Sequence, residues 1–512
     1  MLSSVPESED GTHIGALLDQ LARSGASEVL AWADHRLSGD ELRASVFRYA
    51  HALRELGIGR GDLVALFAPN TPDALAVRHA ASLLGAPSVF LARPTSPQRR
   101  AALLAQTDPR LLVVFPETAG PEPDSPPNGQ VASIGRVPSA SRRLDELAAE
   151  AEPNPLPSAA RGEDVGVILS SGGTTGVPKG SWRSFGTYAT LVSGPPRPDR
   201  RQLIVTPFAY LSQLLVDTTL LGGGSVVLHE QFDASAVLDT VASERITDLF
   251  LVEPALFALM DHPELDGADL SSLRSLTHVG ASAPGTLRQR AWKRLGTAVT
   301  HSYGASEVGL VSALTPQEIA RRPDLLNTAG KPAPGIELRF RRSDGTFAPS
   351  DEGGVLHLRS PAMASGYWNR PEDEAAAFSG GWYDTDDHAY LDAEGYLHVL
   401  GRTGDLRRTG GVPFADIEDV LCRLPGVRYA VAFPLPDGDG VSAAVVPWPG
   451  STVDAAACRA AVLAACGTSV DPVVAVGSVP VTEQGKPDRS ALQQLAATRT
   501  RPAPEHRPQW TE

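Results

Sequence analysis

The chain has 512 residues, of which 42% are hydrophobic and 21% charged, and its formal net charge is −15. This composition is that of a folded globular protein, and the length favours two or more domains. The acidic balance, with no basic stripe or tail, argues against a nucleic-acid partner. No apolar run approaches the ~18 residues of a membrane-spanning helix, so we expect no membrane association.

The start of the chain and its cysteines bear on the compartment. The segment from Met1 to Asp10 has neither a basic beginning nor an apolar stretch, so no signal peptide is predicted. Cys422, Cys458 and Cys466 are odd in number and lack the spacing of metal ligands. We therefore expect a cytoplasmic protein with reduced thiols.

The N-terminal part alternates predicted strands and helices. Leu63–Phe67 and Ser88–Leu91 are short apolar runs typical of buried strands, and a helical pattern near residues 73–84 lies between them. This β-α-β order predicts a largely parallel sheet. Residues 117–163 are rich in Pro, Ser, Ala and Glu, which predicts a surface connection between subdomains.

A second β-α series follows this connection. Its predicted strands are Leu203–Val205, Ser225–Leu228, Asp248–Val252 and Ser275–Val279, with helices at Asp233–Glu244 and Pro284–Leu295. Beyond Ala329 the predicted strands become shorter and alternate in polarity, as in Gly354–Leu358. Gly and Pro turns separate them, which predicts an antiparallel or barrel-like piece.

A smaller module begins after Arg402. Its predicted elements are a helix at Ile417–Leu424, strands at Ala430–Phe433 and Ser442–Val446, and a helix at Ala455–Cys466. The tail from about Thr498 is polar and rich in proline, so we expect disorder there.

The run from Ser170 to Gly180, SSGGTTGVPKG, is the first segment that indicates chemistry. Its small residues let backbone N–H groups approach phosphate oxygens, and Thr174 and Thr175 add hydroxyl donors. It is not a Walker loop, because other residues separate Gly176 from Lys179. A flexible turn without function is the alternative interpretation.

Lysine usage points to this segment and to a second one. Only four lysines occur, beside 41 arginines. Lys179 and Lys486 both lie in motifs suited to phosphate, where a compact, mobile ammonium can reach a crowded anion better than a planar guanidinium. Lys293 and Lys331 need no chemical explanation.

Further motifs follow in an order that resembles the adenylate-forming superfamily, which includes acyl-CoA synthetases, aryl-acid ligases, peptide-synthetase adenylation domains and firefly luciferase. The phosphate-binding run is similar to the signature loop of that superfamily, and the resemblance covers about residues 12–495. The other matching segments are His301–Glu307 (HSYGASE), Gly366–Pro371 (GYWNRP), Trp382–Asp387 (WYDTDD), Gly401–Asp405 (GRTGD) and Pro480–Arg489 (PVTEQGKPDR).

The resemblance implies a fold and its domains. We expect an α/β protein whose large N-terminal domain, residues 1–404, consists of two α/β subdomains plus a small β-barrel and binds ATP and the substrate. A smaller mobile C-terminal α/β lid, residues 405–497, would rotate about a hinge at Asp405. Residues 498–512 would form the tail.

The resemblance also implies roles for single residues. Lys486 would bridge the attacking carboxylate and the α-phosphate of ATP, and Glu307 would bind Mg²⁺. Tyr303 would pack along the adenine, and Asp387, with Arg402 beside it, would bind the ribose. The implied catalytic residues are Lys486, Glu307 and Thr174, and the implied nucleotide-binding residues are Ser171, Gly172, Gly173, Thr174, Thr175, Gly176, Lys179, Ser302, Tyr303, Gly304, Ser306, Asp387 and Arg402.

Departures from the superfamily pattern narrow the substrate. Tyr210 stands where the gate of the acyl pocket is often His, and Leu211 replaces the Asn of the dihydroxybenzoate-binding branch. A catechol acid is therefore not expected, and a less polar aryl or short acyl acid remains. The expected pocket residues are Tyr210, Leu211, Gly280, Ala281, Ser282 and Ala305.

A further departure concerns the acceptor. The stretch from Gly410 to Glu418 is shorter than usual in the superfamily, where it lines the thiol tunnel, and Pro413 stiffens it. Adenylation would be unaffected, but thioester formation is put in doubt. A neutral loop deletion is the alternative.

Three functions stay open. The leading one is an ATP-dependent ligase that makes an acyl- or aryl-adenylate and passes it to a thiol of CoA or of a carrier-protein phosphopantetheine. The second keeps adenylation but uses a non-thiol acceptor, either in amide formation or in nitrite activation for N–N bond formation on an amine. The third is a nucleotide-binding protein without catalysis, suggested by Asp386 in place of Gly and Ser306 in place of Thr.

Overall fold

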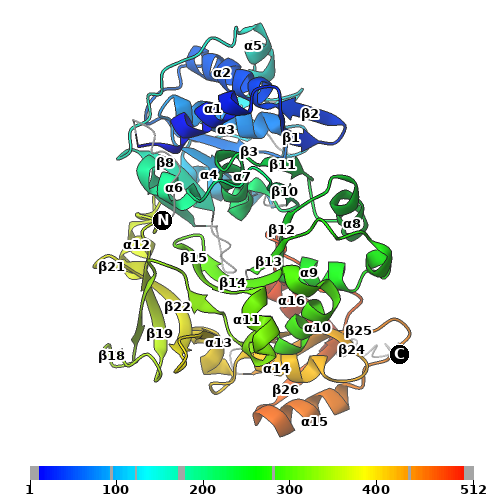
Figure 1. The fold of residues 1–512 in the computed structure, drawn as a ribbon. Coiled ribbons are helices and arrows are strands. Elements are labelled where there is room, and N and C mark those ends of the chain that lie inside the picture. The colour runs from blue at the N-terminus through cyan, green and yellow to red at the C-terminus, as the bar shows by residue number, and fades with distance from the viewer. Residues whose placement is uncertain are drawn as a thin grey trace, which may run out of the picture.

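The computed structural model describes residues 11–92, 96–120, 124–170, 179–279, 283–435 and 440–500. In these ranges the chain forms two large sheets, an antiparallel sheet and a small three-stranded sheet, stacked from the N-terminal to the C-terminal half (Figure 1). No helix in the described ranges is both long and apolar enough to cross a lipid bilayer.

The first large sheet is built mainly from the N-terminal β-α units. Its central strand β3 is buried at all four positions, as expected for a parallel strand covered on both faces. β9 closes one side in antiparallel fashion and pairs with β20, from a distant part of the chain. The strand order is β20 (Gly366–Tyr367), β9 (Gly180–Ser184), β8 (Val165–Ser170), β4 (Ser88–Phe90), β3 (Val64–Phe67), β5 (Leu111–Val114), β6 (Gln130–Ser133) and β7 (Arg142–Arg143).

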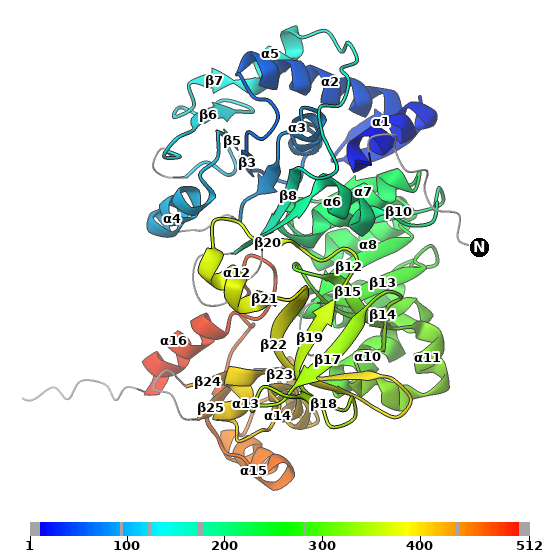
Figure 2. The same cartoon turned by 90° about the vertical axis from the view of Figure 1, so that its left-hand side faces the viewer.

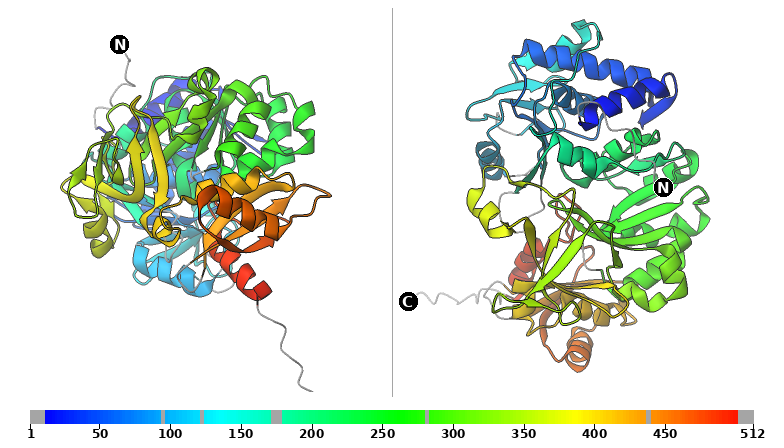
Figure 3. Two further views of the ribbon diagram at one scale, coloured as in Figure 1. Left: turned by 90° about the horizontal axis from the view of Figure 1, so that it is seen from below. Right: turned by 60° about the vertical axis from the view of Figure 1, so that its left-hand side comes forward.

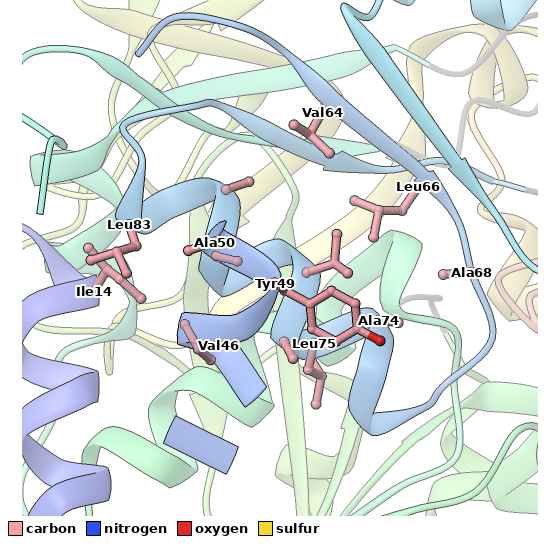
Figure 4. Packing of buried hydrophobic residues seen from close by; sticks show 14 of the residues in the cluster. Ile14, Val46, Tyr49, Ala50, Val64, Leu66, Ala68, Ala74, Leu75 and Leu83 are labelled. Carbon is pink, nitrogen blue, oxygen red and sulfur yellow. The ribbon is translucent and has the colours of Figure 1, made fainter. Parts of the chain in front are cut away.

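Helices cover this sheet and start at recognisable signals. Ser38 caps α2 and forms a capping box with Glu41, and Thr71 caps α3, which has Pro72 at its first position. Tyr49, Leu75 and neighbouring side chains fill the space between these helices and the sheet (Figure 4). The helices are α1 (His13–Ser24), α2 (Gly39–Glu55), α3 (Pro72–Leu83), α4 (Pro97–Thr107), α5 (Leu144–Glu150) and α6 (Phe185–Val192).

The second large sheet is parallel in its centre. β1 joins it beside β11, so the start of the chain completes a sheet made mostly of residues beyond 200. Its order is β16 (Lys331–Pro332), β15 (Gly309–Leu314), β14 (Val299–Ala305), β13 (Ser275–Val279), β12 (Asp248–Val252), β10 (Arg201–Ile204), β11 (Ser225–Leu228), β1 (Glu28–Trp32) and β2 (His35–Ser38). The associated helices are α7 (Gln213–Leu221), α8 (Ala234–Ser243), α9 (Glu253–Met260), α10 (Gly285–Leu295) and α11 (Pro316–Arg321).

The third sheet is antiparallel, as predicted beyond Ala329. The piece expected to be barrel-like has an open strand order among the described residues, from β18 to β21, with β23 paired to β22. It lies beside the second sheet, and α12 stands at its edge next to the first sheet (Figure 2). Its elements are β17 (Glu337–Arg341), β18 (Phe347–Ala348), β19 (Gly354–Arg359), α12 (Pro371–Ala377), β21 (Phe378–Ser379), β22 (Trp382–Leu391) and β23 (Leu397–Arg402).

The C-terminal module packs against the part of the chain that carries the second sheet, and it lies below α9 and α10 in Figure 1. Figure 3 shows the same module, coloured orange to red, from two further sides. The helix predicted at Ile417–Leu424 begins earlier, at Phe414, because Pro413 occupies its N-cap. The last helix runs through Thr500, into the segment that we expected to be tail. The elements are α13 (Thr403–Arg408), α14 (Phe414–Cys422), β24 (Val427–Pro434), β25 (Val441–Pro447), α15 (Ala455–Cys466), β26 (Val470–Ala475) and α16 (Arg489–Thr500).

One segment was assigned wrongly from the sequence. Residues 117–163 were predicted to be a surface connection, yet they contain β6, β7 and α5. β6 pairs in parallel with β5 and extends the first sheet. Its residues Gln130–Ser133 are only half apolar, so the strand gives little periodic signal at an edge of the sheet.

Candidate active site

Asp387, Tyr303 and Arg402 form one compact cluster. The Tyr303 hydroxyl donates to Oδ2 of Asp387 at 2.5 Å, and Nε of Arg402 lies 3.0 Å from Oδ1. Asp387 and Arg402 are opposite each other in the β22–β23 pair, whereas Tyr303 comes from β14. A carboxylate has further lone pairs beyond these two contacts, so Asp387 can still accept hydrogen bonds from vicinal hydroxyls.

Burial governs the charge of this cluster. It raises the pKa of Asp387, while Arg402 and the Tyr303 hydroxyl lower it by stabilising the carboxylate. Burial lowers the pKa of Arg402, but Asp387, Tyr383, Tyr303 and Asp386 together outweigh it and the net shift is upward. The net shift of the Asp387 pKa is upward, and the ion pair with Arg402 opposes the effect of burial.

Asp386, the residue that replaces the usual Gly, has a left-handed backbone with φ of 58°. Asp is among the non-glycine residues that accept this conformation most readily. Its N–H donates to Oδ1 of Asp384 at 2.9 Å, and its carbonyl accepts from the Thr403 hydroxyl at 3.2 Å. The substitution therefore keeps the local turn and leaves the neighbouring Asp387 in place.

Glu307 is buried, with 6% of its surface exposed. The Tyr367 hydroxyl donates to its Oε1 at 2.8 Å, and Ala364 N–H donates to its carbonyl at 2.7 Å. Segment 366–371, which includes β20, thereby fixes the carboxylate that follows β14. The sequence assigned no role to Tyr367, although this residue lies within the GYWNRP motif.

Arg183 stands behind Glu307 and is fully buried. Its guanidinium donates to the carbonyls of Ala362 at 2.8 Å and of Ser306 at 2.7 Å. Burial lowers its pKa to about 10, and the charge of Glu307 opposes that shift. Arg183 thus holds the backbone on either side of the site and balances a buried carboxylate.

Gly304 is required by the closeness of two strands. A Cβ at this position would lie 2.4 Å from the carbonyl oxygen of Gly309 in β15. The β14–β15 register also shifts between Tyr303 and Gly304. This irregularity lets β14 place Ser302, Tyr303, Ala305 and Ser306 at the end of the second sheet, where ligands of α/β folds commonly bind.

Lys179 lies beside the ring of Tyr367. Its Nζ is 2.5 Å from Oδ1 of Asp373 and 5.1 Å from the centre of the Tyr367 ring. One side chain, that of Tyr367, therefore contacts both the ammonium of Lys179 and the buried carboxylate of Glu307. Asp373, at the start of α12, was not singled out from the sequence.

Lys486 stands at the turn of a hairpin that reaches into the site from the C-terminal module. Thr482 N–H donates to the Lys486 carbonyl at 2.8 Å, and Val481 bridges Pro487. An added Cβ on Gly485 would lie 2.8 Å from Cγ2 of Val252, so the turn touches the end of β12.

The surroundings of Lys486 are charged. Burial lowers its pKa and so does Arg402, whereas Glu307 and Asp387 raise it. The structure therefore brings together the residues predicted from separate motifs, Lys486, Glu307, Asp387 and Arg402. Asp405 lies in α13, immediately beyond this cluster.

The expected gate lies in an irregular turn. Residues Phe208–Ser212 form a π-helical turn before α7, and Tyr210 departs from helical geometry with φ of −119° and ψ of −135°. Asn70 holds the turn by accepting from Phe208 N–H at 3.1 Å and by donating to the Thr206 carbonyl at 2.9 Å. Such bulges are frequent at functional sites.

A buried ionic network anchors the helix that follows this gate. Asp217 of α7 accepts from Nη1 of Arg78 at 2.7 Å and from the Tyr188 hydroxyl at 2.6 Å. His79 Nε2 is 2.9 Å from the same carboxylate. All four side chains come from α3, α6 and α7, so the gate rests on a rigid scaffold.

Two glutamates face the contact between the second sheet and the C-terminal module. Tyr429 donates to Oε1 of Glu253 at 2.9 Å, and Arg489 Nη2 donates to Oε1 of Glu418 at 3.0 Å. Burial raises the pKa of Glu418 to about 8, and it raises the pKa of Glu253 as well. Neither the lone Glu253 nor Tyr429 carried a sequence motif that could have marked this contact.

Two glycines with left-handed backbone conformations lie in the short stretch before Glu418. Gly410 and Gly411 have φ of 67° and 95°, and Gly411 N–H donates to the Leu406 carbonyl at 2.7 Å. Pro413 then caps α14. The short connection thus passes directly from α13 to α14.

Some predicted residues lie outside the described part of the chain. These are Ser171, Gly172, Gly173, Thr174, Thr175 and Gly176 of the phosphate-binding run and Gly280, Ala281 and Ser282 of the pocket. Leu211 and Ala305 are half-buried, and Leu211 packs between the two large cores.

Glu307 is suited to Mg²⁺ as a single protein ligand. It offers a hard carboxylate, and Mg²⁺ commonly takes one or two carboxylates together with phosphate oxygens and water. The described residues contain no group of three or more His, Cys, Asp or Glu placed to hold a metal ion.

The layered fold and the convergent Lys, Glu, Asp and Arg side chains define a ligase that forms AMP. The chain belongs to the AMP-binding enzyme family, which matches residues 17–368.

Relatives with an assigned activity cover most of the chain. The medium/long-chain-fatty-acid–CoA ligase FadD8 of Mycobacterium tuberculosis is 31% identical over 94% of this chain and 90% of its own length. The feruloyl-CoA synthase of an Amycolatopsis species is 34% identical over 81% of this chain and 84% of its own length. Among solved structures, the amide bond synthetase McbA from Marinactinospora thermotolerans has a TM-score of 0.80 and 32% identity, covering 94% of this chain and 99% of that one.

Proposed function

We propose that the protein activates an aryl or short acyl carboxylic acid with ATP and transfers the acyl group to the thiol of CoA. The observation that carries this proposal is the position of Lys486 among Asp387, Arg402 and Glu307. In the first step a carboxylate oxygen bonds to the α-phosphorus of ATP while the bond to the bridging oxygen breaks. The products of this step are acyl-AMP and pyrophosphate.

The proposed roles are those that the resemblance to the superfamily implies. Tyr303 offers a flat face to the adenine, and Asp387 accepts the ribose hydroxyls. Lys179, together with the run at 171–176, holds the outer phosphates, with Thr174 donating to them. Mg²⁺ at Glu307 would neutralise phosphate charge. Backbone groups of Ser302, Gly304 and Ser306 line the nucleotide wall.

Lys486 carries the chemical step in this proposal. Its ammonium feels the charges of Asp387 and Glu307, and we expect it to contact the attacking oxygen and the α-phosphate when the substrates bind. A preorganised donor aimed at developing charge is commonly the largest contribution to catalysis. Burial and Arg402 lower the pKa of Lys486, and Glu307 and Asp387 oppose that shift because their charges favour the ammonium form.

The acid is expected to be aromatic or short. The pocket would be lined by Tyr210, Leu211 and Ala305, together with the small residues Gly280, Ala281 and Ser282. Feruloyl-CoA synthase and the indoleacetate–CoA ligase of Aromatoleum aromaticum, 31% identical over 92% of this chain, activate aryl acids. These relatives support an aryl acid, whereas FadD8 is a medium/long-chain-fatty-acid–CoA ligase, so the test includes aliphatic acids as well.

A second acceptor is favoured by two observations. McbA is an amide bond synthetase that matches 99% of its own length to this chain, and the connection between α13 and α14 is short and capped by Pro413. An amine in place of CoA would leave the first half-reaction unchanged. The CoA ligases among the relatives support the thiol, so the amine is the second candidate.

The test is a panel assay for acid-dependent pyrophosphate release with ATP and Mg²⁺. The panel contains cinnamic, indoleacetic, benzoic, short-chain and medium-chain acids, with nitrite as a separate arm. We expect release with at least one aryl acid. Release with nitrite alone would contradict carboxylate activation and favour N–N bond formation on an amine.

The acceptor is then decided by product analysis with the preferred acid. Reactions containing CoA, a simple amine or neither are compared by mass spectrometry. An acyl-CoA thioester is expected. An amide formed at a rate independent of CoA, with no thioester, would replace the thiol by an amine, and loading of a purified carrier protein would extend the acceptor to phosphopantetheine.

A further inference from the structure

The ammonium of Lys179 is already paired with a carboxylate of the same chain. Nζ lies 2.5 Å from Oδ1 of Asp373, and Arg370 Nη1 lies 3.2 Å from the other carboxylate oxygen. The hydrogen bond from Lys179 lowers the pKa of Asp373, so the aspartate is charged at neutral pH. Asp373 therefore already engages the ammonium that we propose binds the outer phosphates.

The backbone sets the position of Asp373. Pro371 begins α12 directly after the GYWNRP motif, so Arg370 and Asp373, three residues apart, lie on one side of the first turn. β20, just before this turn, pairs with β9, the strand that follows Lys179. α12 accordingly stands beside the first sheet, where Figure 2 shows it next to β20.

The pair is close to the buried carboxylate of the site. The Tyr367 ring lies 5.1 Å from Nζ of Lys179, and the hydroxyl of the same residue donates to Glu307 at 2.8 Å. Lys179 is thus held on the wall that carries Glu307. A polyphosphate bound beside Glu307 would therefore lie close to the Lys179–Asp373 pair.

The pair is reversible because both partners meet solvent. The exposed fractions of the two side chains are 37% for Lys179 and 29% for Asp373. Ion pairs at such exposure contribute little to stability and are readily exchanged. A polyphosphate with several negative charges can displace Asp373, while Asp373 can take the ammonium back when the polyphosphate leaves.

We propose that Asp373 is an internal competitor of the polyphosphate for Lys179. It weakens the binding of ATP and of pyrophosphate, and it assists pyrophosphate release by recapturing the ammonium. The inference rests on the proposed function of Lys179 in binding the outer phosphates. Asp373 is a positioning residue, since it acts through Lys179.

The experiment measures equilibrium binding by calorimetry on the full chain, first with Mg·ATP and then with Mg·pyrophosphate, both without acid. Asp373→Asn is compared with Glu372→Gln, the exposed neighbour on α12, which loses the same charge but not the Lys179 contact. We expect Asp373→Asn to lower both dissociation constants about 3- to 10-fold, because removal of one competing charge frees the ammonium. Glu372→Gln should change them less than twofold, as expected for a screened surface charge.

The Lys179→Gln background shows whether Asp373 acts through Lys179. There, Asp373→Asn should leave both dissociation constants unchanged. An equal tightening in that background would overturn the inference, as would tightening by Glu372→Gln that matches Asp373→Asn. Weaker binding by Asp373→Asn would overturn it as well.

Turnover supplies an independent readout. Product inhibition by pyrophosphate should strengthen about 3- to 10-fold in Asp373→Asn, in parallel with the binding change. Inhibition equal to that of the unaltered protein would contradict the release role. Because binding is measured without acid, tightening in a protein that activates no acid would support the competitor while refuting the proposed function.

Discussion

Asp386 has a backbone conformation that few side chains accept. Its φ of 58° lies in the left-handed region, and the preceding Asp384 accepts its N–H. Because Asp is tolerated there and Gly is usual in the superfamily, the substitution does not by itself indicate lost catalysis. Its neighbour Asp387 keeps both contacts, to Tyr303 and Arg402.

Variants at Asp386 test this interpretation. Asp386→Gly should keep the stability within about 0.5 kcal/mol, because relief of strain offsets the greater freedom of Gly in the unfolded chain. Asp386→Val should cost about 1–2 kcal/mol more, since β-branched residues are rarely left-handed. The midpoint of urea unfolding measures both, and equal midpoints for the two variants would contradict the assignment.

Asp387→Asn should weaken ATP binding. Loss of the carboxylate removes charge-assisted acceptors for ribose hydroxyls, so KM for ATP is expected to rise about 10- to 100-fold. The preference for ATP over 2′-deoxy-ATP should shrink at the same time. The matched control is Asp384→Asn in the same strand, whose side chain contacts Arg341 and His357 and whose amide oxygen can still accept from the Asp386 N–H. A similar loss in both variants would assign the effect to the strand and not to the ribose contact.

At the scale of elements, the strands and helices followed largely from the sequence. Apolar runs predicted β3, β4, β11, β12 and β13, and α15 begins and ends where the helical pattern does. The segment containing β6 was missed, because an edge strand with half-polar residues has no clear period. Long-range pairings such as β1 with β11 and β20 with β9 leave no local signal.

The site was predictable where motifs carry it and not elsewhere. Separate motifs predicted Glu307, Asp387, Arg402 and Lys486, and the structure places them in one region. Asp373, Asn70 and Glu253 depend on contacts between distant segments, so no spacing could have identified them. Tyr367 lay within a quoted motif, but only the 2.8 Å contact with Glu307 indicates its role.

The contact between α9 and β24 should depend on pH. A buried carboxyl with a raised pKa binds more protons in the folded protein than in the unfolded one, so stability falls as pH rises through that window. For Glu418 the window runs from its ordinary 4.5 to about 8, and the pKa of Glu253 is raised in the same direction. We therefore expect this contribution to the melting temperature to fall from about pH 5 to about pH 8 and to level off above that.

Glu253→Gln isolates this effect. The amide oxygen can still accept from Tyr429, but no second buried negative charge remains beside Glu418. The melting temperature between about pH 5 and pH 8 should fall less steeply than in the unaltered protein, following the linkage between proton binding and stability. Glu264→Gln, at an exposed position, serves as the control. An unchanged pH profile in Glu253→Gln would contradict an effect of the Glu253 charge on the pKa of Glu418.

At the scale of the whole molecule, the site is assembled from distant parts. The first sheet supplies Lys179, the second sheet Tyr303 and Glu307, the third sheet Asp387, and the C-terminal module Lys486. Movement of the C-terminal module about Asp405 would remove Lys486 from this cluster, and such rotation between half-reactions remains a prediction. The Glu253–Tyr429 contact joins the second sheet's α9 to the module and would break in such a movement, whereas Glu418 and Arg489 both lie within the module and would move together.

The central claim is that Lys486 completes a site for activating an acid with ATP. The most direct measurement is acid-dependent exchange of labelled pyrophosphate into ATP, which reports the first half-reaction without any acceptor. We expect exchange with an aryl acid in the unaltered protein, a loss of about 10²–10³-fold in Lys486→Ala, and full exchange in Lys293→Ala, which removes an exposed lysine of α10. Exchange that survives in Lys486→Ala would contradict the account.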